Sequence, residues 1–384
     1  MALSVLVEKY GKYLPITEKT PQLTLGEGDT PLIQVPSLEM LLDTRLSHKL
    51  HKLIERNLRI FVKYEHENHS TASFKDRGMV IAVMKAVEEG YSMLLCASTG
   101  STGASAAAYG AAAGIPVLVI VPKSVPIGKL AQIRMYGADT MIANGNFDYA
   151  LKVAREIADK NPTIKLVNSV NEYRIEGQKT AAFEICDTLG SLSGKEAEAP
   201  DFHFLPVGNA GNITAYWKGY TEYFNDGKID KRPKMMGYQA SGAAPIVKGR
   251  VIENKDLRTD ASAIRIGNPA SWKRALTARD ESGGLIDKVS DRQMYEAQFF
   301  LSAKSGRSIY VELASAASVA GIFKYDLQNP FPENSTIVAV VTGSGIKDPK
   351  SAGKNPFKKE VIRLHNGTDA SAIANKIITS YNSR

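Results

Sequence analysis

One segment of the chain shows the pattern from which the architecture is predicted: Met93-Leu94-Leu95-Cys96-Ala97-Ser98-Thr99-Gly100-Ser101-Thr102-Gly103-Ala104-Ser105. An apolar run comes first, a turn of glycines and hydroxyl side chains follows, and alanines then begin. A short apolar run that ends in such a turn predicts a buried strand, and the alanines predict a helix directly after it. A strand, a glycine-rich turn and a helix in this order are typical of α/β proteins.

The same alternation continues through the 384 residues. Buried strands are predicted at 94–96, 117–121, 141–142, 165–167, 202–205, 236–238 and 337–341, and helices at 104–113, 147–158, 177–189 and 317–327. Apolar strands that alternate with helices predict mainly parallel sheets flanked by helices. The predicted fold class is therefore α/β.

Composition narrows the class of protein. The chain is 43% hydrophobic and 23% charged, which is ordinary for a globular protein. It has no apolar run of about 20 residues and no basic start before an apolar segment, so we expect neither a membrane span nor a secretory signal. Two cysteines, Cys96 and Cys186, are too few for a disulfide framework, and a cytoplasmic location is the default expectation.

The net charge of +8 has two interpretations, nucleic-acid affinity or an anion site on a solvated surface. The basic residues are spread along the chain without interleaved aromatics, so we expect no nucleic-acid partner. His66 and His69 lack companion ligands, so we expect no metal site.

The candidate reactive residue is the lysine of Ser73-Phe74-Lys75-Asp76-Arg77-Gly78. The hexapeptide alone fits a surface lysine at a helix start equally well. Schiff-base chemistry needs a lysine amine that can be neutral, and burial with a neighbouring cation such as Arg77 lowers a lysine pKa.

Two turns that follow predicted strands are suited to anions, because ligands bind at the carboxyl ends of strands and at helix N-termini. Residues 98–103 offer four hydroxyls and two glycines ahead of an alanine-rich helix, which favours a carboxylate site over a simple helix cap. Gly208-Asn209-Ala210-Gly211-Asn212 allows the backbone to wrap a phosphate. A tight turn with asparagines at positive φ is the alternative for the second segment.

Two further signals are weaker. Thr342 ends the last strong strand and can point its hydroxyl at a ligand above the sheet edge. Asn168, Ser169 and Arg174 follow another strand and together suit a second anion, although Arg174 could equally be a surface arginine.

Together these segments resemble the threonine synthases, members of the tryptophan-synthase-β family of pyridoxal-phosphate (PLP) enzymes with fold type II. The resemblance covers nearly the whole chain, through residues 25–32, 73–79, 96–100, 173–180, 206–220, 264–272 and 342–349. It implies PLP as cofactor and conversion of O-phospho-L-homoserine and water to L-threonine and phosphate.

The resemblance also implies a role for each candidate. Lys75 would form the Schiff base and transfer the α and β protons, with Phe74 near the cofactor ring and Thr342 facing its pyridine nitrogen. Five residues would hold the cofactor phosphate: Gly208, Asn209, Ala210, Gly211 and Asn212. Ser98, Thr99 and Thr102 would take the substrate carboxylate. Asn168, Ser169 and Arg174, with Thr102, would take the substrate phosphate.

The implied architecture has PLP in a cleft between two domains. Residues 75–170 would form a small mobile domain that closes on substrate and 171–345 a large PLP-binding domain. Residues 1–74 would belong largely to the large domain, and 346–384 would form a C-terminal tail. A homodimer that acts on a small phospho-amino acid, without nucleic acid or membrane, is expected.

Three places depart from the family pattern. Ser101 stands where an asparagine normally contacts the cofactor's 3′-oxygen. Asn68-His69-Ser70-Thr71-Ala72 replaces Asn-Pro-Thr-Gly, and Gly343-Ser344-Gly345 replaces Gly-Asn-Gly or Gly-His-Gly.

These departures leave alternatives open. Neutral drift in a working synthase explains them, and so does a paralogue with altered ligand tolerance, such as a phosphonate-inhibitor-resistant form. A lyase or β-replacement enzyme acting on another phospho-amino acid is a further possibility. A non-catalytic protein that binds phosphorylated metabolites or nucleic acid is a different class, against which Lys75 argues.

Overall fold

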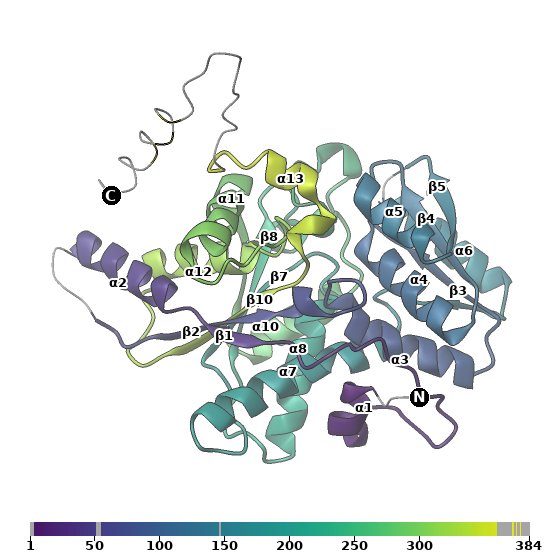
Figure 1. Ribbon diagram of the computed structural model, residues 1–384, viewed down its shortest axis with the longest axis horizontal. Coiled ribbons are helices and arrows are strands. Elements are labelled where there is room, and N and C mark those ends of the chain that lie inside the picture. Colours follow the sequence, from purple (N-terminus) through teal and green to yellow (C-terminus); the bar gives the residue numbers. More distant parts are fainter. Residues whose placement is uncertain are drawn as a thin grey trace.

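The structure, a computed structural model, describes residues 4–50, 55–145 and 147–358, together with Ser371, Ala374 and Ile377. Two sheets organise the chain (Figure 1). The larger sheet has the order β1-β2-β10-β7-β8-β9, and the smaller has the order β5-β4-β3-β6. All neighbouring strands are parallel except β1, which runs antiparallel to β2. The α/β fold class predicted from the sequence is confirmed.

The strands of the larger sheet are β1 (Leu32–Gln34), β2 (Arg59–Tyr64), β7 (Phe202–Pro206), β8 (Lys234–Ala240), β9 (Leu285–Val289) and β10 (Thr336–Val341). Those of the smaller sheet are β3 (Met93–Ala97), β4 (Val117–Pro122), β5 (Asp139–Ala143) and β6 (Ile164–Leu166). The helices are α1 (Val5–Tyr10), α2 (Pro36–Leu50), α3 (Lys75–Glu88), α4 (Ser101–Ala113), α5 (Ile127–Met135), α6 (Phe147–Lys160), α7 (Glu172–Leu192), α8 (Gly211–Asn225), α9 (Pro245–Lys248), α10 (Trp272–Glu281), α11 (Asp291–Phe299), α12 (Ala317–Gln328) and α13 (Pro349–Gly353).

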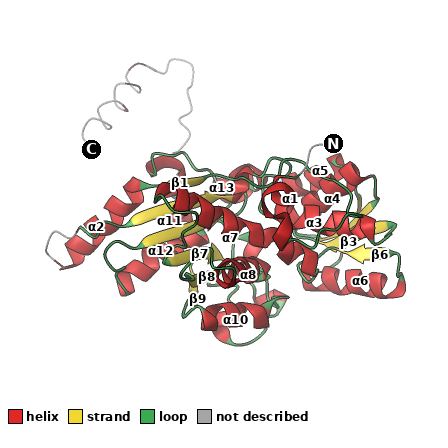
Figure 2. Cartoon of the chain, turned by 90° about the horizontal axis from the view of Figure 1, so that it is seen from below, coloured by secondary structure: helices red, strands yellow, loops and turns green. Residues whose placement is uncertain are grey.

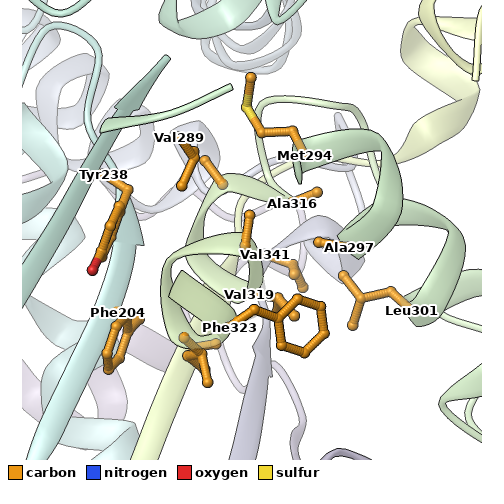
Figure 3. Packing of buried hydrophobic residues seen from close by; sticks show 14 of the residues in the cluster. Phe204, Tyr238, Val289, Met294, Ala297, Leu301, Ala316, Val319, Phe323 and Val341 are labelled. Atoms are coloured by element: carbon orange, nitrogen blue, oxygen red, sulfur yellow. The ribbon is translucent and has the colours of Figure 1, made fainter. Parts of the chain in front are cut away.

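Helices cover both faces of the larger sheet (Figure 2). Because side chains alternate along a strand, β10 sends Ile337 and Ala339 to one core and Val338 and Val340 to the other. The first core is closed by α2, α11 and α12, and Figure 3 shows Val319 and Phe323 of α12 in that packing. The second core is closed by α7, α8 and α10. Burial on both faces explains why β10 is apolar from Ile337 to Val341.

We call α3 to α6 with the smaller sheet the small lobe, and β1, α2, β2 and the chain from α7 onward the large lobe. The N-terminal residues Leu6, Leu14 and Leu23 pack in the core of the small lobe. The lobes join where α3 crosses α7. The crossing is close because both helices have a glycine there: a Cβ on Gly78 would lie 2.5 Å from the carbonyl oxygen of Arg174, and one on Gly177 would strike Arg77. This crossing brings Arg174 to the start of α3, beside Lys75.

The small lobe falls within the range predicted for a small domain, but its separate motion stays a prediction. Much of the predicted C-terminal tail, 346–384, lies outside the described residues. None of the helices in the described ranges is long and apolar enough to cross a membrane.

Candidate active site

A pocket lies where the carboxyl ends of β3, β7 and β10 meet the N-terminus of α3. It encloses about 840 Å³ of space, part of which is open to solvent. Its walls include all but one of the residues singled out from the sequence: Phe74, Lys75, Ser98, Thr99, Ser101, Thr102, Asn168, Ser169, Gly208, Asn209, Ala210, Gly211, Asn212 and Thr342. The exception is Arg174. The fold therefore gathers segments from both lobes around one space, as expected at the strand ends of an α/β protein.

Lys75 is the first residue of α3 and faces this pocket. Its Nζ lies 4.0 Å from the centroid of the Phe74 ring. Burial lowers the pKa of Lys75 to about 7, and the nearby guanidinium of Arg174 contributes in the same direction. A large share of the amine is thus neutral near neutral pH, which is the form that attacks a carbonyl.

The turn after β3 presents its polar groups to the same pocket. The Ser98 hydroxyl oxygen accepts hydrogen bonds from the backbone N–H groups of Gly100 (2.9 Å) and Gly103 (2.8 Å), which leaves its own proton available to donate. Gly100 has φ +137°, a conformation that only glycine adopts easily. The hydroxyl of Ser101 is buried without a hydrogen-bond partner among the described residues. The turn thus offers an anion the start of α4 with donors still free.

The turn after β7 forms a backbone cradle. Ala210 precedes α8 in the left-handed conformation, at φ +66°. The Asn209 carbonyl oxygen accepts from the Ser271 N–H at 3.0 Å, which holds the turn in place. Both side-chain polar atoms of Asn212 are buried without a partner in the described chain. The Asn212 amide N–H groups can therefore donate to a phosphate held at this helix N-terminus.

Thr342 is held by a residue that the sequence did not point to. The Ser315 and Thr342 hydroxyl oxygens lie 2.9 Å apart, and Ser315 Oγ accepts from the backbone N–H groups of Thr342 and Gly343, both at 3.0 Å. Ser315 therefore fixes the direction of the Thr342 hydroxyl at the end of β10.

The residues predicted to bind a second anion differ in their availability. The Asn168 side chain is paired on both sides with Ala97, accepting from its N–H at 2.9 Å and donating to its carbonyl oxygen at 2.8 Å, so one amide proton remains. Arg174 is fully buried and donates once, to the Val167 carbonyl oxygen at 2.8 Å. Its Nε and second terminal nitrogen have no partner among the described residues, although it does not line the pocket. A contact of Arg174 with a substrate phosphate stays a prediction.

The altered segment 68–72 keeps a specific conformation. Ala72 has φ +53°, which explains why the family pattern has glycine at this place. Thr71 donates its N–H and hydroxyl to the buried Asp76 carboxylate at 2.9 and 2.7 Å, and Lys347 donates to the Thr71 carbonyl oxygen. The segment is therefore tied to the residue that follows Lys75.

Four pocket residues lie outside every motif quoted from the sequence: Phe147, Ala263, Glu312 and Ala314. Glu312 is 4% exposed and forms an ion pair with Lys129 of α5. Burial alone would raise the pKa of Glu312, but Lys129 brings it below the ordinary value. Neither residue stands in a motif with a chemical signature, so only the folded arrangement identifies them. No group of three His, Cys, Asp or Glu side chains in the described ranges is placed to hold a metal.

These features fit PLP. A lysine amine with a lowered pKa, an unpaired Asn212 amide in a backbone cradle and an oriented hydroxyl on Thr342 are the three kinds of group that such a cofactor needs: a covalent attachment, a phosphate site and a partner for the ring nitrogen.

Comparison with known proteins agrees with this fit. The model of the family "Pyridoxal-phosphate dependent enzyme" matches residues 23–343. The threonine synthase of Halalkalibacterium halodurans is 51% identical over 348 residues, 90% of each chain. That of Synechocystis is 48% identical over 351 residues, 91% of this chain and 85% of the relative. That of Methanocaldococcus jannaschii is 43% identical over 364 residues, 92% and 84% respectively.

Solved structures agree at the level of the fold. A PLP-dependent aspartate racemase superposes with a TM-score of 0.66 at 21% identity, covering 86% of this chain and 93% of its own. Maize serine racemase superposes with a TM-score of 0.65 at 16% identity, covering 92% of this chain and 93% of its own.

Proposed function

The chain belongs to the threonine synthases of the PLP-dependent enzyme family, and from this premise we propose how its residues divide the work. The enzyme is a PLP-dependent lyase that converts O-phospho-L-homoserine and water to L-threonine and phosphate. The observation that carries the division of roles is the position of Lys75. Its amine, with a pKa lowered to about 7, shares one pocket with two separate anion-binding turns.

Lys75 is the residue that attaches the cofactor and moves protons at the substrate. PLP, when bound, withdraws electrons from the substrate amino acid and so makes its α and β protons removable. The Phe74 ring beside the amine limits the directions in which Lys75 can reach. Gly208, Asn209, Ala210, Gly211 and Asn212 hold the cofactor phosphate through the cradle at α8, and Thr342 and Ser101 face other edges of the ring.

The substrate has two anionic ends, and the pocket offers a set of donors for each. Ser98, Thr99 and Thr102 lie at the start of α4, where the free hydroxyl proton of Ser98 and the helix N–H groups suit a carboxylate. Asn168, Ser169 and Arg174 take the phosphate, with the unpaired nitrogens of Arg174 as its counter-charge. Holding both ends fixes the reacting carbons near Lys75 and orients them.

The attachment residue is tested directly by reduction. PLP-loaded protein treated with borohydride and digested should yield one modified peptide, with the cofactor on Lys75. Lys75→Arg, which keeps the positive charge, is the control and should yield no modified peptide. A modification on another lysine would contradict the assignment.

We also propose altered ligand tolerance at the ring edge. The family asparagine is replaced by Ser101, whose buried hydroxyl has no partner in the described chain. A shorter side chain leaves room beside the cofactor, so a phosphonate analogue of the substrate would be held differently. A panel of O-phospho-L-homoserine, O-phospho-L-serine and the phosphonate tests this proposal. If the phosphonate inhibits the unmodified enzyme as strongly as it inhibits the Ser101→Asn variant, the proposal is contradicted.

We propose further that the enzyme is a cytoplasmic homodimer. Both cysteines are buried as free thiols, which suits a reducing compartment. The edge strand β5 exposes Met141 and Ile142, and α5 exposes Ile127 and Met135 on the same lobe. A contiguous exposed apolar patch often marks an interface, and we propose that these side chains contribute to one. Light scattering of the purified enzyme should give twice the chain mass, and Met141→Asp together with Ile142→Lys should reduce it.

A further inference from the structure

The ion pair Lys129–Glu312 joins the two lobes at the floor of the pocket. Lys129 belongs to α5 of the small lobe, and Glu312 belongs to the loop between η5 (Phe300–Lys304) and α12 of the large lobe. Lys129 Nζ lies 2.8 Å from Glu312 Oε2, and the two side chains are 1% and 5% exposed. Such a pair is strongly coupled because each charge would otherwise be buried alone.

The stem of Lys129 supports the turn assigned to the substrate carboxylate. A Cβ placed on Gly100 would lie only 2.6 Å from the Lys129 Cβ and 2.9 Å from its Cγ, so the backbone of the turn rests directly on this stem. Lysine stems often pack in this way while the charged end is satisfied elsewhere. The position of Gly100, between Ser98 and Thr102, therefore depends on where Lys129 is held.

Glu312 connects the other end of the pair to the cofactor side. Its Oε1 lies 2.7 Å from where a Cβ on Gly343 would be, and its backbone N–H donates to the Gly343 carbonyl oxygen at 3.0 Å. Gly343 follows Thr342 in the chain. A continuous series of packed groups thus runs from the turn at Gly100 through Lys129 and Glu312 to the end of β10.

We propose that Lys129 is a positioning residue for the reaction. Its ion pair with Glu312 across the cleft keeps the turn 98–102 at a fixed distance from Lys75, so that a substrate carboxylate bound by the turn lies correctly for the reaction. This inference rests on the proposed role of that turn. It predicts that loss of the anchor weakens binding of the carboxylate end and spares the phosphate end. Among the described residues, no hydrogen bond or ion pair joins Asn168, Ser169 or Arg174 to Lys129 or Glu312.

The test uses the full-length, PLP-loaded enzyme. Lys129→Met keeps most of the stem but removes the charge, Lys129→Arg restores a charge, and the double variant Lys129→Met/Glu312→Gln leaves no unpaired buried charge. Lys165→Met is the matched control, because Lys165 pairs with Glu89 within the small lobe, away from the pocket. For each, KM and kcat with O-phospho-L-homoserine, the inhibition constant of inorganic phosphate, PLP content and Tm are measured.

We expect Lys129→Met to raise KM about tenfold or more, with the phosphate inhibition constant changed less than about twofold. Lys129→Arg should recover much of the loss. The double variant should regain Tm but keep the raised KM, which a merely structural role would not produce. The proposal is contradicted if KM of the double variant returns to the unmodified value together with Tm. It is also contradicted if KM of Lys129→Met rises together with the inhibition constant of phosphate. Failure of the unmodified enzyme to form threonine would instead contradict the proposed function.

Discussion

The amine of Lys75 lies 4.0 Å from the centre of the Phe74 ring. A ring face at this distance favours the charged amine. Burial and Arg174 act in the opposite direction and prevail, since the pKa of Lys75 is lowered to about 7. Near pH 7 the Lys75 amine is therefore close to the balance between its two protonation states.

This balance predicts how cofactor capture depends on pH. The neutral amine is the reactive form, and its share rises as pH increases through the pKa of about 7. The rate at which cofactor-free protein binds PLP should therefore rise between about pH 6 and pH 8 and then level off. With an ordinary lysine the rate would continue to rise up to about pH 10. Stopped-flow absorbance measures the rate. A rate that is still rising steeply above about pH 9 would contradict the lowered pKa.

Removal of the buried guanidinium should affect substrate and lysine together. In Arg174→Met, the phosphate end of the substrate loses its counter-charge, and KM should rise about tenfold or more. The pKa of Lys75 should also rise, because Arg174 contributes to lowering it. The midpoint of the PLP-capture profile then moves to higher pH. Arg274→Met, which removes the exposed pair with Glu172, should change neither quantity. An unchanged KM in Arg174→Met would show that this arginine does not serve the substrate.

Ser101→Asn restores the family's residue next to the ring. An amide reaches further than the unpaired hydroxyl, so we expect a shift of the cofactor's visible absorbance or a change in sensitivity to the phosphonate analogue. Ser92→Asn, at an exposed serine that does not line the pocket, is the control. If spectrum, kinetics and inhibition all stay the same, the serine reflects neutral drift.

The backbone at Ala72 predicts a stabilising change. Its φ of +53° is unfavourable for a residue with a Cβ, and glycine removes that strain while adding flexibility to the unfolded chain. We expect Ala72→Gly to raise the free energy of unfolding slightly, by about 1 kcal/mol or less. Ala112→Gly, in the helical conformation of α4, should lower it by about 0.5–1 kcal/mol. Urea unfolding of both variants gives the comparison, and a loss of stability in Ala72→Gly would contradict it.

The central part of the fold could be predicted because its signals are local. Strands β7 and β10 are mainly apolar runs followed by turn residues, and the structure confirms both. Strand β9 was missed because it lies at a sheet edge and includes Asp287 and Lys288. Strand β2 was missed as well, and it places Lys63 in the interior, where Glu184 lies 2.7 Å away. No local sequence pattern around Lys63 predicts that it pairs with Glu184, which is distant in the chain.

The site residues also divide into those that the sequence predicts and those that only the structure reveals. Lys75 and the turns at Ser98 and Gly208 belong to contiguous motifs. Their chemical roles could therefore be predicted from the sequence without the structure. Ser315 and Lys129 act through partners in other segments, Thr342 and Glu312. These pairs form only when segments far apart in the chain come together in the fold, so neither role could be inferred from the sequence.

The central claim, that Lys75 and its two anion-binding turns form a threonine-making site, is tested most directly by one assay. Purified PLP-loaded enzyme is given O-phospho-L-homoserine, and L-threonine and phosphate are followed together, with a folded Lys75→Ala variant alongside. The account predicts threonine and phosphate in equal amounts from the unmodified enzyme and neither from the variant. Phosphate without threonine, or equal turnover by Lys75→Ala, would contradict it.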